Sequence, residues 1–354
     1  MSTTKRNWFE YNKAKTSRFQ IFISLLLLIL DTVPLPSLYK GKGRKPYSTR
    51  DIVICLCFKI YYKTSYRDII GELNNHKKEL GLKKVPHFNT LRKYMVDPRM
   101  TVILGILLLF LLQPIAALET TFASDATGFG TSRKSEYFSV VTKSQTKKDA
   151  GTKKEKKKLL QKKKKKDFVK LHVTIGTVTQ MVVCAVSTIG KKHESTQFET
   201  MVSMVATVFS IKEWLGDAGY LSRKACNLVS KQHGIPYFWP KSNSTPKSRG
   251  SYAWSDMMIM FKKNLEFFKK HYHQRSKVES VFSVIKNYFG NTVFSRKIEG
   301  QLNELLVKVL DYNLCRLGEV AFYMKIDINS YFLCCEIEEV TPMSKCVLPQ
   351  TSHG

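Results

Sequence analysis

The sequence predicts an α/β protein in which an all-helical N-terminal region precedes a mixed sheet flanked by helices. Two observations support this prediction. Over residues 1–118 the apolar residues recur at helical spacing, and from about residue 119 they alternate as they do in strands. The chain has 354 residues, which suggests two or three domains and allows a sizeable core.

The N-terminal region, residues 1–118, contains three short predicted helices that end in a basic one. The segments are STRDIVICLCFKIYY, which begins with a Ser/Thr cap signal, then SYRDIIGELNN and PHFNTLRKYM. In the last segment we expect Asn89 or Thr90 to cap a helix that carries Arg92 and Lys93. This pattern is typical of a helix-turn-helix unit whose last helix enters the major groove of DNA. An ordinary helical bundle would show the same periodicity.

Two apolar runs, residues 19–30 and 102–112, raise the question of a membrane segment. Both are shorter than the ~18 to 20 residues that a spanning helix needs. A basic stretch precedes the first run, but no small-residue cleavage site follows it. We therefore expect two buried helices and no membrane insertion.

The second half of the chain, residues 119–317, changes from helical to strand periodicity and back. The segment 211–241 predicts a strand, an acidic turn, a helix and a strand, and residues 271–290 predict a last helix. Before them we expect a helix over 195–209 and strands over 119–130, 135–143, 168–176 and 181–190. This order is typical of a ribonuclease H-like sheet. A Lys-rich loop at about 143–167 interrupts the strands, and residues 318–354 are expected to form a C-terminal tail.

The charge balance predicts a polyanionic partner. The formal net charge is +30, and residues 143–170 supply +11 of it, which leaves +19 for the rest of the chain. A basic excess spread through folded regions points first to nucleic acid and second to an anionic membrane surface. The eight cysteines contain no CxxC and match no zinc template, so they are expected to be reduced thiols that pack in the interior.

Three acidic residues stand where a sheet of this kind could bring them together. Asp125 lies at the expected close of the first strand, Asp217 follows a later strand, and Glu279 lies on the last helix. Two-metal phosphoryl transfer needs such hard oxygen ligands for Mg²⁺. Each Asp motif alone is a weak signal because Asp is common in turns. The chain has 28 acidic residues against 58 Lys and Arg residues, so an acid at each of these three places is less expected by chance.

The last predicted helix places Tyr272, Arg275, Glu279 and Lys286 on one narrow stripe beside an apolar face. An amphipathic helix with a solvated charged edge would show the same spacing. The helix alone therefore leaves both interpretations open.

The segment YHQRSKVESVFSVIK matches, at each defined position, the Tyr-x2-Arg-x3-Glu-x6-Lys signature of DDE transposases from prokaryotic insertion sequences. SDATGFG resembles the strand of that family with the first acid, and GDAGYLSRK resembles the turn with the second. NWFEYNKAKTSRF is similar to the opening stretch of the family. The resemblance covers most of residues 8–317.

The resemblance implies roles for these residues. Asp125, Asp217 and Glu279 would bind two Mg²⁺ ions, with Mn²⁺ as a substitute, and Tyr272, Arg275 and Lys286 would hold transposon-end DNA. The chain would cut DNA at insertion-sequence ends and join the 3′-hydroxyl ends to target DNA. The partners would be the terminal inverted repeats and target DNA, bound by a homodimer. We expect a cytoplasmic protein associated with the nucleoid.

Three other functions fit parts of the sequence. A tyrosine recombinase would use Tyr272 as nucleophile, with Arg and His residues around it and no metal. A domesticated, catalytically inactive transposase would only bind DNA, and a basic membrane-surface protein would use the two apolar runs. EDTA sensitivity of DNA cleavage separates the first two from a DDE transposase, and cell fractionation tests the third. His172 and His193 are expected to be structural and not metal ligands.

Overall fold

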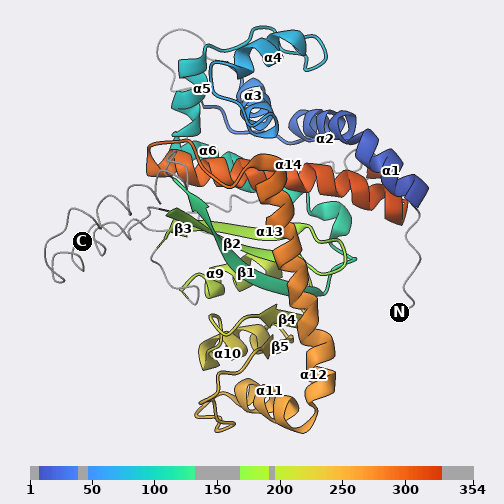
Figure 1. The fold of residues 1–354 in the computed structure, drawn as a ribbon, viewed down its shortest axis with the longest axis vertical. Helices are drawn as coiled ribbons and strands as arrows, with labels where there is room; N and C mark the ends of the chain where they lie inside the picture. The colour runs from blue at the N-terminus through green and yellow to red at the C-terminus, as the bar shows by residue number, and fades with distance from the viewer. Residues whose placement is uncertain (1–7, 39–46, 132–167, 191–195, 329–354) are drawn as a thin grey trace, which may run out of the picture.

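The computed structural model describes residues 8–38, 47–131, 168–190 and 196–328. Figure 1 shows a helical N-terminal layer above the long helix α14, and a sheet with further helices below it. The predicted strand at 135–143, the Lys-rich loop and His193 lie outside the described residues.

The N-terminal layer is helical, as the apolar spacing predicts. Ser48 caps α3 by accepting a hydrogen bond from the Asp51 amide. The prediction that Asn89 or Thr90 caps α5 was wrong. The N-cap is His87, which has extended backbone and whose imidazole accepts a hydrogen bond from the Asn89 amide. The elements are α1 (Trp8–Thr16), α2 (Arg18–Thr32), α3 (Thr49–Tyr61), α4 (Ile69–Asn75), α5 (Phe88–Met95), α6 (Pro98–Phe110) and the 3-10 turn η1 (Gln113–Ile115).

The two apolar runs form α2 and α6, and both contact α14. Helix α6 buries Ile103, Leu104 and Leu107. By length and composition alone, one segment of the described chain, Pro98–Ile115, could cross a membrane. Core helices pass the same test, so this is weak evidence for a membrane span.

The sheet is mixed and has five strands in the order β3-β2-β1-β4-β5. β1 pairs antiparallel with β2 and β2 with β3, whereas β1, β4 and β5 run parallel. The strands are β1 (Thr121–Gly130), β2 (Phe168–Gly176), β3 (Val182–Ile189), β4 (Glu213–Gly216) and β5 (Ile235–Phe238). This topology is consistent with a ribonuclease H-like domain.

The predicted helix over 271–290 is not continuous. Tyr272 ends one helix, a 3-10 turn follows, and a new helix begins at Ser276. Figure 1 shows the two helices in succession as one column beside the sheet. The elements of this half are α9 (Phe198–Ala206), α10 (Arg223–Lys231), α11 (Tyr252–Lys263), α12 (Leu265–Tyr272), η3 (His273–Arg275), α13 (Ser276–Phe289) and α14 (Ile298–Met324). Helix α14 continues past residue 317, where we had expected a tail to begin.

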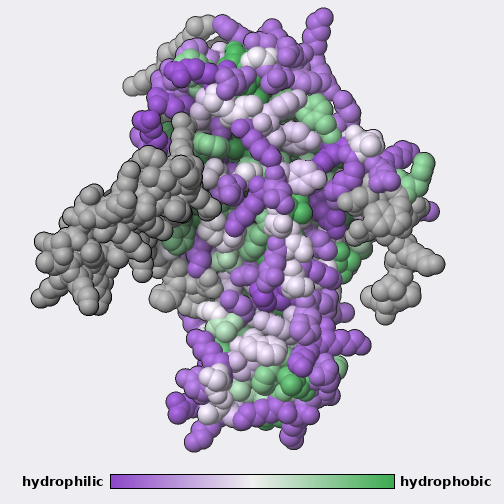
Figure 2. Space-filling model, viewed as in Figure 1, coloured by the Kyte–Doolittle hydropathy of each residue, from purple (hydrophilic) through white to green (hydrophobic). Residues whose placement is uncertain are grey.

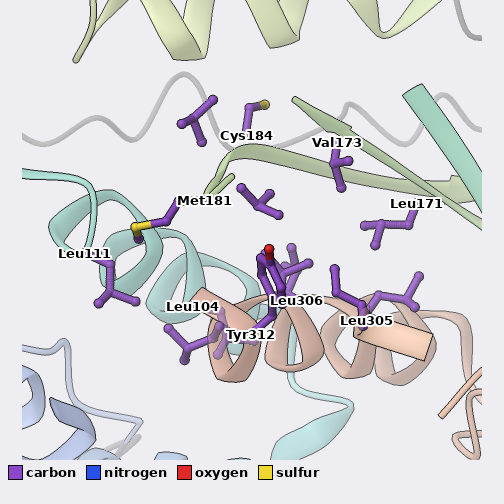
Figure 3. Close-up of a cluster of buried hydrophobic side chains, with 14 of the residues drawn as sticks. Leu104, Leu111, Leu171, Val173, Met181, Cys184, Leu305, Leu306 and Tyr312 are labelled. Atoms are coloured by element: carbon purple, nitrogen blue, oxygen red, sulfur yellow. The ribbon is translucent and has the colours of Figure 1, made fainter. Parts of the chain in front are cut away.

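Helix α14 joins the helical layer to the sheet. It contacts α1, α2, α3, α5 and α6 as well as β2 and β3. Figure 3 shows Leu305, Leu306 and Tyr312 of α14 between leucines of the N-terminal layer and apolar residues of β2 and β3. The Asn313 side chain also donates to the Val182 carbonyl (2.8 Å) and accepts from its amide (2.9 Å), which closes part of the exposed edge of β3. The two layers therefore share one core.

The face seen in Figure 2 is mainly hydrophilic, in keeping with the high charge of the chain. Apolar side chains reach this surface in small areas, among them one near α11 and α12, where Ile259, Leu265 and Phe267 are exposed. The five cysteines in the described parts of the chain are buried free thiols.

Candidate active site at the edge of the sheet

Asp125 and Asp217 follow directly after paired residues of neighbouring strands. Ser124 and Gly216 form the last pair between the parallel strands β1 and β4, and each aspartate is the next residue along the chain. The two aspartates therefore occupy neighbouring positions where β4 ends. We had expected Asp125 to lie at the end of its strand. It does not, because β1 continues to Gly130 with β2 as its partner.

Local hydrogen bonds fix one oxygen of each aspartate. The Ala126 amide donates to Asp125 Oδ1 and the Gly219 amide donates to Asp217 Oδ1, both at 2.8 Å. Such short-range bonds are typical of aspartates in turns and at strand ends. Both side chains are partly buried.

Arg275 connects the first and third acids. Its guanidinium donates to Asp125 Oδ2 at 2.9 Å and to Glu279 Oε1 at 2.6 Å. The Asp125 and Arg275 side chains are 17% and 19% exposed, and that of Glu279 is 59% exposed. Burial alone would lower the pKa of Arg275, but Tyr272 and the two carboxylates raise it above its usual value. Arg275 thus keeps its charge between the two acids.

Tyr272 lies half-buried in an aromatic cluster next to Arg275. Its ring centroid is 5.1 Å from that of Trp239 and 6.1 Å from that of Phe268, and the Arg275 guanidinium lies 5.9 Å from it. Burial raises the pKa of the phenol, Arg275 lowers it, and the two aspartates raise it again, for a net increase. The phenol therefore holds its proton at neutral pH.

Lys286 lies over the second half of β1. Its Nζ donates to Thr127 Oγ1 at 2.6 Å and is 5.4 Å from the centroid of the Phe129 ring. Burial lowers its pKa. Lys286 is seven residues after Glu279 on α13, about 10 Å along the helix axis at 1.5 Å per residue. The two share a helix face as predicted, whereas Tyr272 and Arg275 belong to α12 and η3.

Arg92 and Lys93 are exposed in the last turn of α5. Helix α5 lies on the other side of α14 from α10, α11 and α12 (Figure 1). The structure therefore does not bring these two cations to the acids, and their contact with DNA stays a prediction.

Thr127 and Trp239 also lie near the acids and were not predicted from the sequence. Thr127 lies two residues after Asp125 and so on the same face of β1, and Trp239 directly follows β5, the third parallel strand. Both positions could have been found from the strand pattern. His172 is structural, as expected: it is buried, its Nε2 lies 3.0 Å from Thr188 Oγ1, and burial lowers its pKa to about 4.

The donor set fits Mg²⁺ in its chemistry, because three carboxylates offer the hard oxygens that this ion prefers. Their arrangement is not yet that of a metal site. Within the described parts of the chain, no three His, Cys, Asp or Glu residues come close enough together to hold a metal ion. The Arg275 guanidinium lies between Asp125 and Glu279 instead.

Residues 117–314 match the family model described as the transposase DDE domain. The match covers more than half of the chain and includes all three acids, so this chain belongs to the DDE transposase family. No curated protein and no solved structure shows a significant match. The narrower assignment to the insertion-sequence group with the Tyr-Arg-Glu-Lys signature stays a prediction.

Proposed function

We propose that this chain is a transposase that cuts DNA at the ends of an insertion sequence and joins the 3′-hydroxyl ends to target DNA. The observation that supports this best is the placement of Asp125 and Asp217 directly after the last pair of β1 and β4, with Glu279 linked to Asp125 through Arg275. Membership in a family that acts on DNA through metal-dependent chemistry supports the same proposal.

In this proposal Asp125, Asp217 and Glu279 hold two Mg²⁺ ions. When bound, the ions stabilise the attacking and leaving oxygens of the phosphoryl group. The two aspartates are held by their local hydrogen bonds, whereas Glu279 is 59% exposed and is paired with Arg275 on the same helical segment. Glu279 is therefore the acid whose position can change most easily.

Arg275 is proposed to exchange partners during the reaction. A guanidinium uses the same planar fork of N–H donors for carboxylates and for phosphates. A phosphate of the end DNA at this place would compete with Asp125 and Glu279 for Arg275. Its release from the acids and its capture by DNA would then be one event.

Tyr272, Lys286 and the α5 cations complete the proposed DNA surface. Tyr272 presents its half-buried ring and hydroxyl next to Arg275, and Lys286 lies farther along β1. Arg92 and Lys93 would contact DNA at some distance from the scissile phosphate. The chain would bind both element ends as a homodimer.

The Lys-rich tract, residues 153–166, lies outside the described residues and is proposed to add phosphate binding without sequence preference. Deletion of 153–166 should flatten the salt dependence of DNA binding, and an unchanged slope would contradict that role.

Cleavage of end DNA in Mg²⁺ and in EDTA tests the proposed reaction. We expect strand cleavage in Mg²⁺ or Mn²⁺, none in EDTA, and DNA binding in both conditions. Cleavage that persists in EDTA and disappears in Tyr272→Phe would instead indicate a tyrosine recombinase.

A second candidate function is DNA binding without catalysis, by a transposase-derived protein that has lost activity. The observation that favours it is that Arg275 pairs with two of the three acids, which places a cation of the chain itself between them. Binding of end DNA with no cleavage under any metal condition would support this candidate.

A further inference from the structure

Lys308 of α14 is buried where α13 ends. Its side chain is about 1% exposed, and its Nζ donates to the carbonyls of Phe289 (2.6 Å), Gly290 (2.7 Å) and Thr292 (2.9 Å). The last carbonyls of a helix lack partners within the helix and carry partial negative charge. A buried ammonium is costly unless it is paired. Lys308 thus caps α13 by satisfying three carbonyls at once.

Glu304, one turn earlier on α14, holds the rest of the same loop. Its buried carboxylate accepts hydrogen bonds from the Phe294 amide (3.0 Å), the Ser295 amide (3.1 Å) and the Ser295 hydroxyl (3.0 Å). Lys59 of α3 lies 3.7 Å from it and is also buried. We call Lys308 and Glu304 the α14 clamp. Together they fix the loop between α13 and α14 from one helix.

The loop is also joined to the end of β1. The Gly130 amide donates to the Asn291 carbonyl (3.2 Å), and the Val293 amide donates to the Gly130 carbonyl (2.9 Å). Next to Gly130, the fully buried Phe129 ring has Lys308 Nζ 5.5 Å and Lys286 Nζ 5.4 Å from its centroid. The clamp therefore holds the end of β1 as well as the end of α13.

Lys286 lies between the two held elements. It precedes Phe289 by three residues, less than one turn, and its Nζ is bonded to Thr127 of β1. Movement of the α13 end or of the β1 end would displace its ammonium. Both ends are fixed by Lys308, which is buried and cannot touch DNA itself.

We propose that Lys308 is a positioning residue for Lys286: it holds the last turn of α13 and, through the loop, the end of β1, and so sets where the Lys286 ammonium meets DNA. The proposal rests on the proposed function, in which Lys286 binds a phosphate of the element end. Lys308 lies on α14, outside the segment with the Tyr-Arg-Glu-Lys signature.

Gel shifts with end DNA in EDTA at several salt concentrations test this inference. The variants are Lys308→Met, Lys286→Ala, the double variant, and Leu310→Ala as a control that alters the same buried helix without touching the clamp. We expect Lys286→Ala to weaken binding about tenfold or more by loss of a charge-assisted phosphate contact. Lys308→Met should weaken it similarly and reduce the salt slope by about one contact, although residue 308 is buried. The double variant should bind no more weakly than Lys286→Ala, and Leu310→Ala should bind like wild type.

The outcomes distinguish the proposed DNA contact of Lys286 from the positioning role of Lys308. If Lys286→Ala binds like wild type, the proposed DNA contact of Lys286 is wrong. If it binds weakly but Lys308→Met binds like wild type, or if the two losses add in the double variant, the positioning role is overturned. Should Lys308→Met fail to fold, Glu304→Gln, which loosens the same loop, replaces it with the same expected results and the same contrary outcomes.

Discussion

The two ends of α13 both carry charged networks, but the N-terminal network includes an exposed carboxylate and the C-terminal one is buried. At the N-terminal end, Arg275 pairs with Asp125 and with Glu279, which is 59% exposed. At the C-terminal end, Lys308 and Glu304 are almost completely buried and bond to backbone groups. Exposed ion pairs are worth little and exchange partners readily, whereas removal of one partner of a buried charged group is strongly destabilising. One helix thus combines an end that can rearrange with an end that cannot.

The largest expected effect is on cleavage, at the exposed end. Asp125→Asn, Asp217→Asn and Glu279→Gln should each abolish Mg²⁺-dependent cleavage of end DNA because each removes a proposed metal ligand. Thermal unfolding of Glu279→Gln should change little, because this side chain is 59% exposed and surface substitutions usually alter stability by less than about 0.5 kcal/mol. Normal cleavage by all three variants would refute the site. Unfolding of Glu279→Gln would refute the contrast between the two ends.

At the buried end we expect the opposite pattern, a loss of stability. Lys308→Met leaves three carbonyls without their buried donor, which should lower the free energy of unfolding by on the order of 3 kcal/mol. Leu310→Ala should cost a similar amount through a cavity, and is therefore a matched control for stability. Urea unfolding measures both. A Lys308→Met protein as stable as wild type would show that the clamp contributes nothing.

Arg275→Ala should have opposite effects on the binding of DNA and of metal at the N-terminal end of α13. End-DNA binding in EDTA should weaken by about 1.5 to 3 kcal/mol through loss of a charge-assisted phosphate contact. Without DNA, the affinity for Mn²⁺ should increase, because Asp125 and Glu279 no longer pair with the Arg275 guanidinium. Calorimetric Mn²⁺ titration measures this, with Lys277→Ala as a control that removes a cation of α13 bonded to the Thr177 carbonyl and to neither acid. Unchanged Mn²⁺ affinity would argue against competition between Arg275 and metal.

A smaller effect should appear in the pH dependence of stability. Burial lowers the pKa of Lys308 to about 8, below its usual 10.5. Between these values the unfolded chain binds more protons than the folded one, so the contribution of Lys308 to stability rises with pH in that window, by on the order of 1 kcal/mol per pH unit. The stability of wild type relative to Lys308→Met should therefore increase from pH 8 to pH 10.5. A constant difference would show that the ammonium is not perturbed by burial.

Local patterning was enough to predict much of the fold. The strands over 168–176 and 181–190 and the helix capped by Ser48 formed where alternation and capping indicate them, because these signals depend on neighbours in the chain. The break at 273–275 was missed because a three-residue 3-10 turn shifts side-chain directions too little to disturb an apolar pattern. Helix α14 was not predicted. It is buried between two layers, and polar residues such as Glu304, Lys308 and Asp311 are buried with the apolar ones instead of forming a solvent-exposed face.

The sequence by itself determined which acids are available, their order along the chain and the cations beside them. It could not show that Arg275 binds Asp125, 150 residues away, or that Lys308 is enclosed with three carbonyls. Spacing along a helix or strand decides which side chains share a face. Contacts between distant segments depend on strand register and on the packing of α14 against both layers, which only the tertiary structure sets.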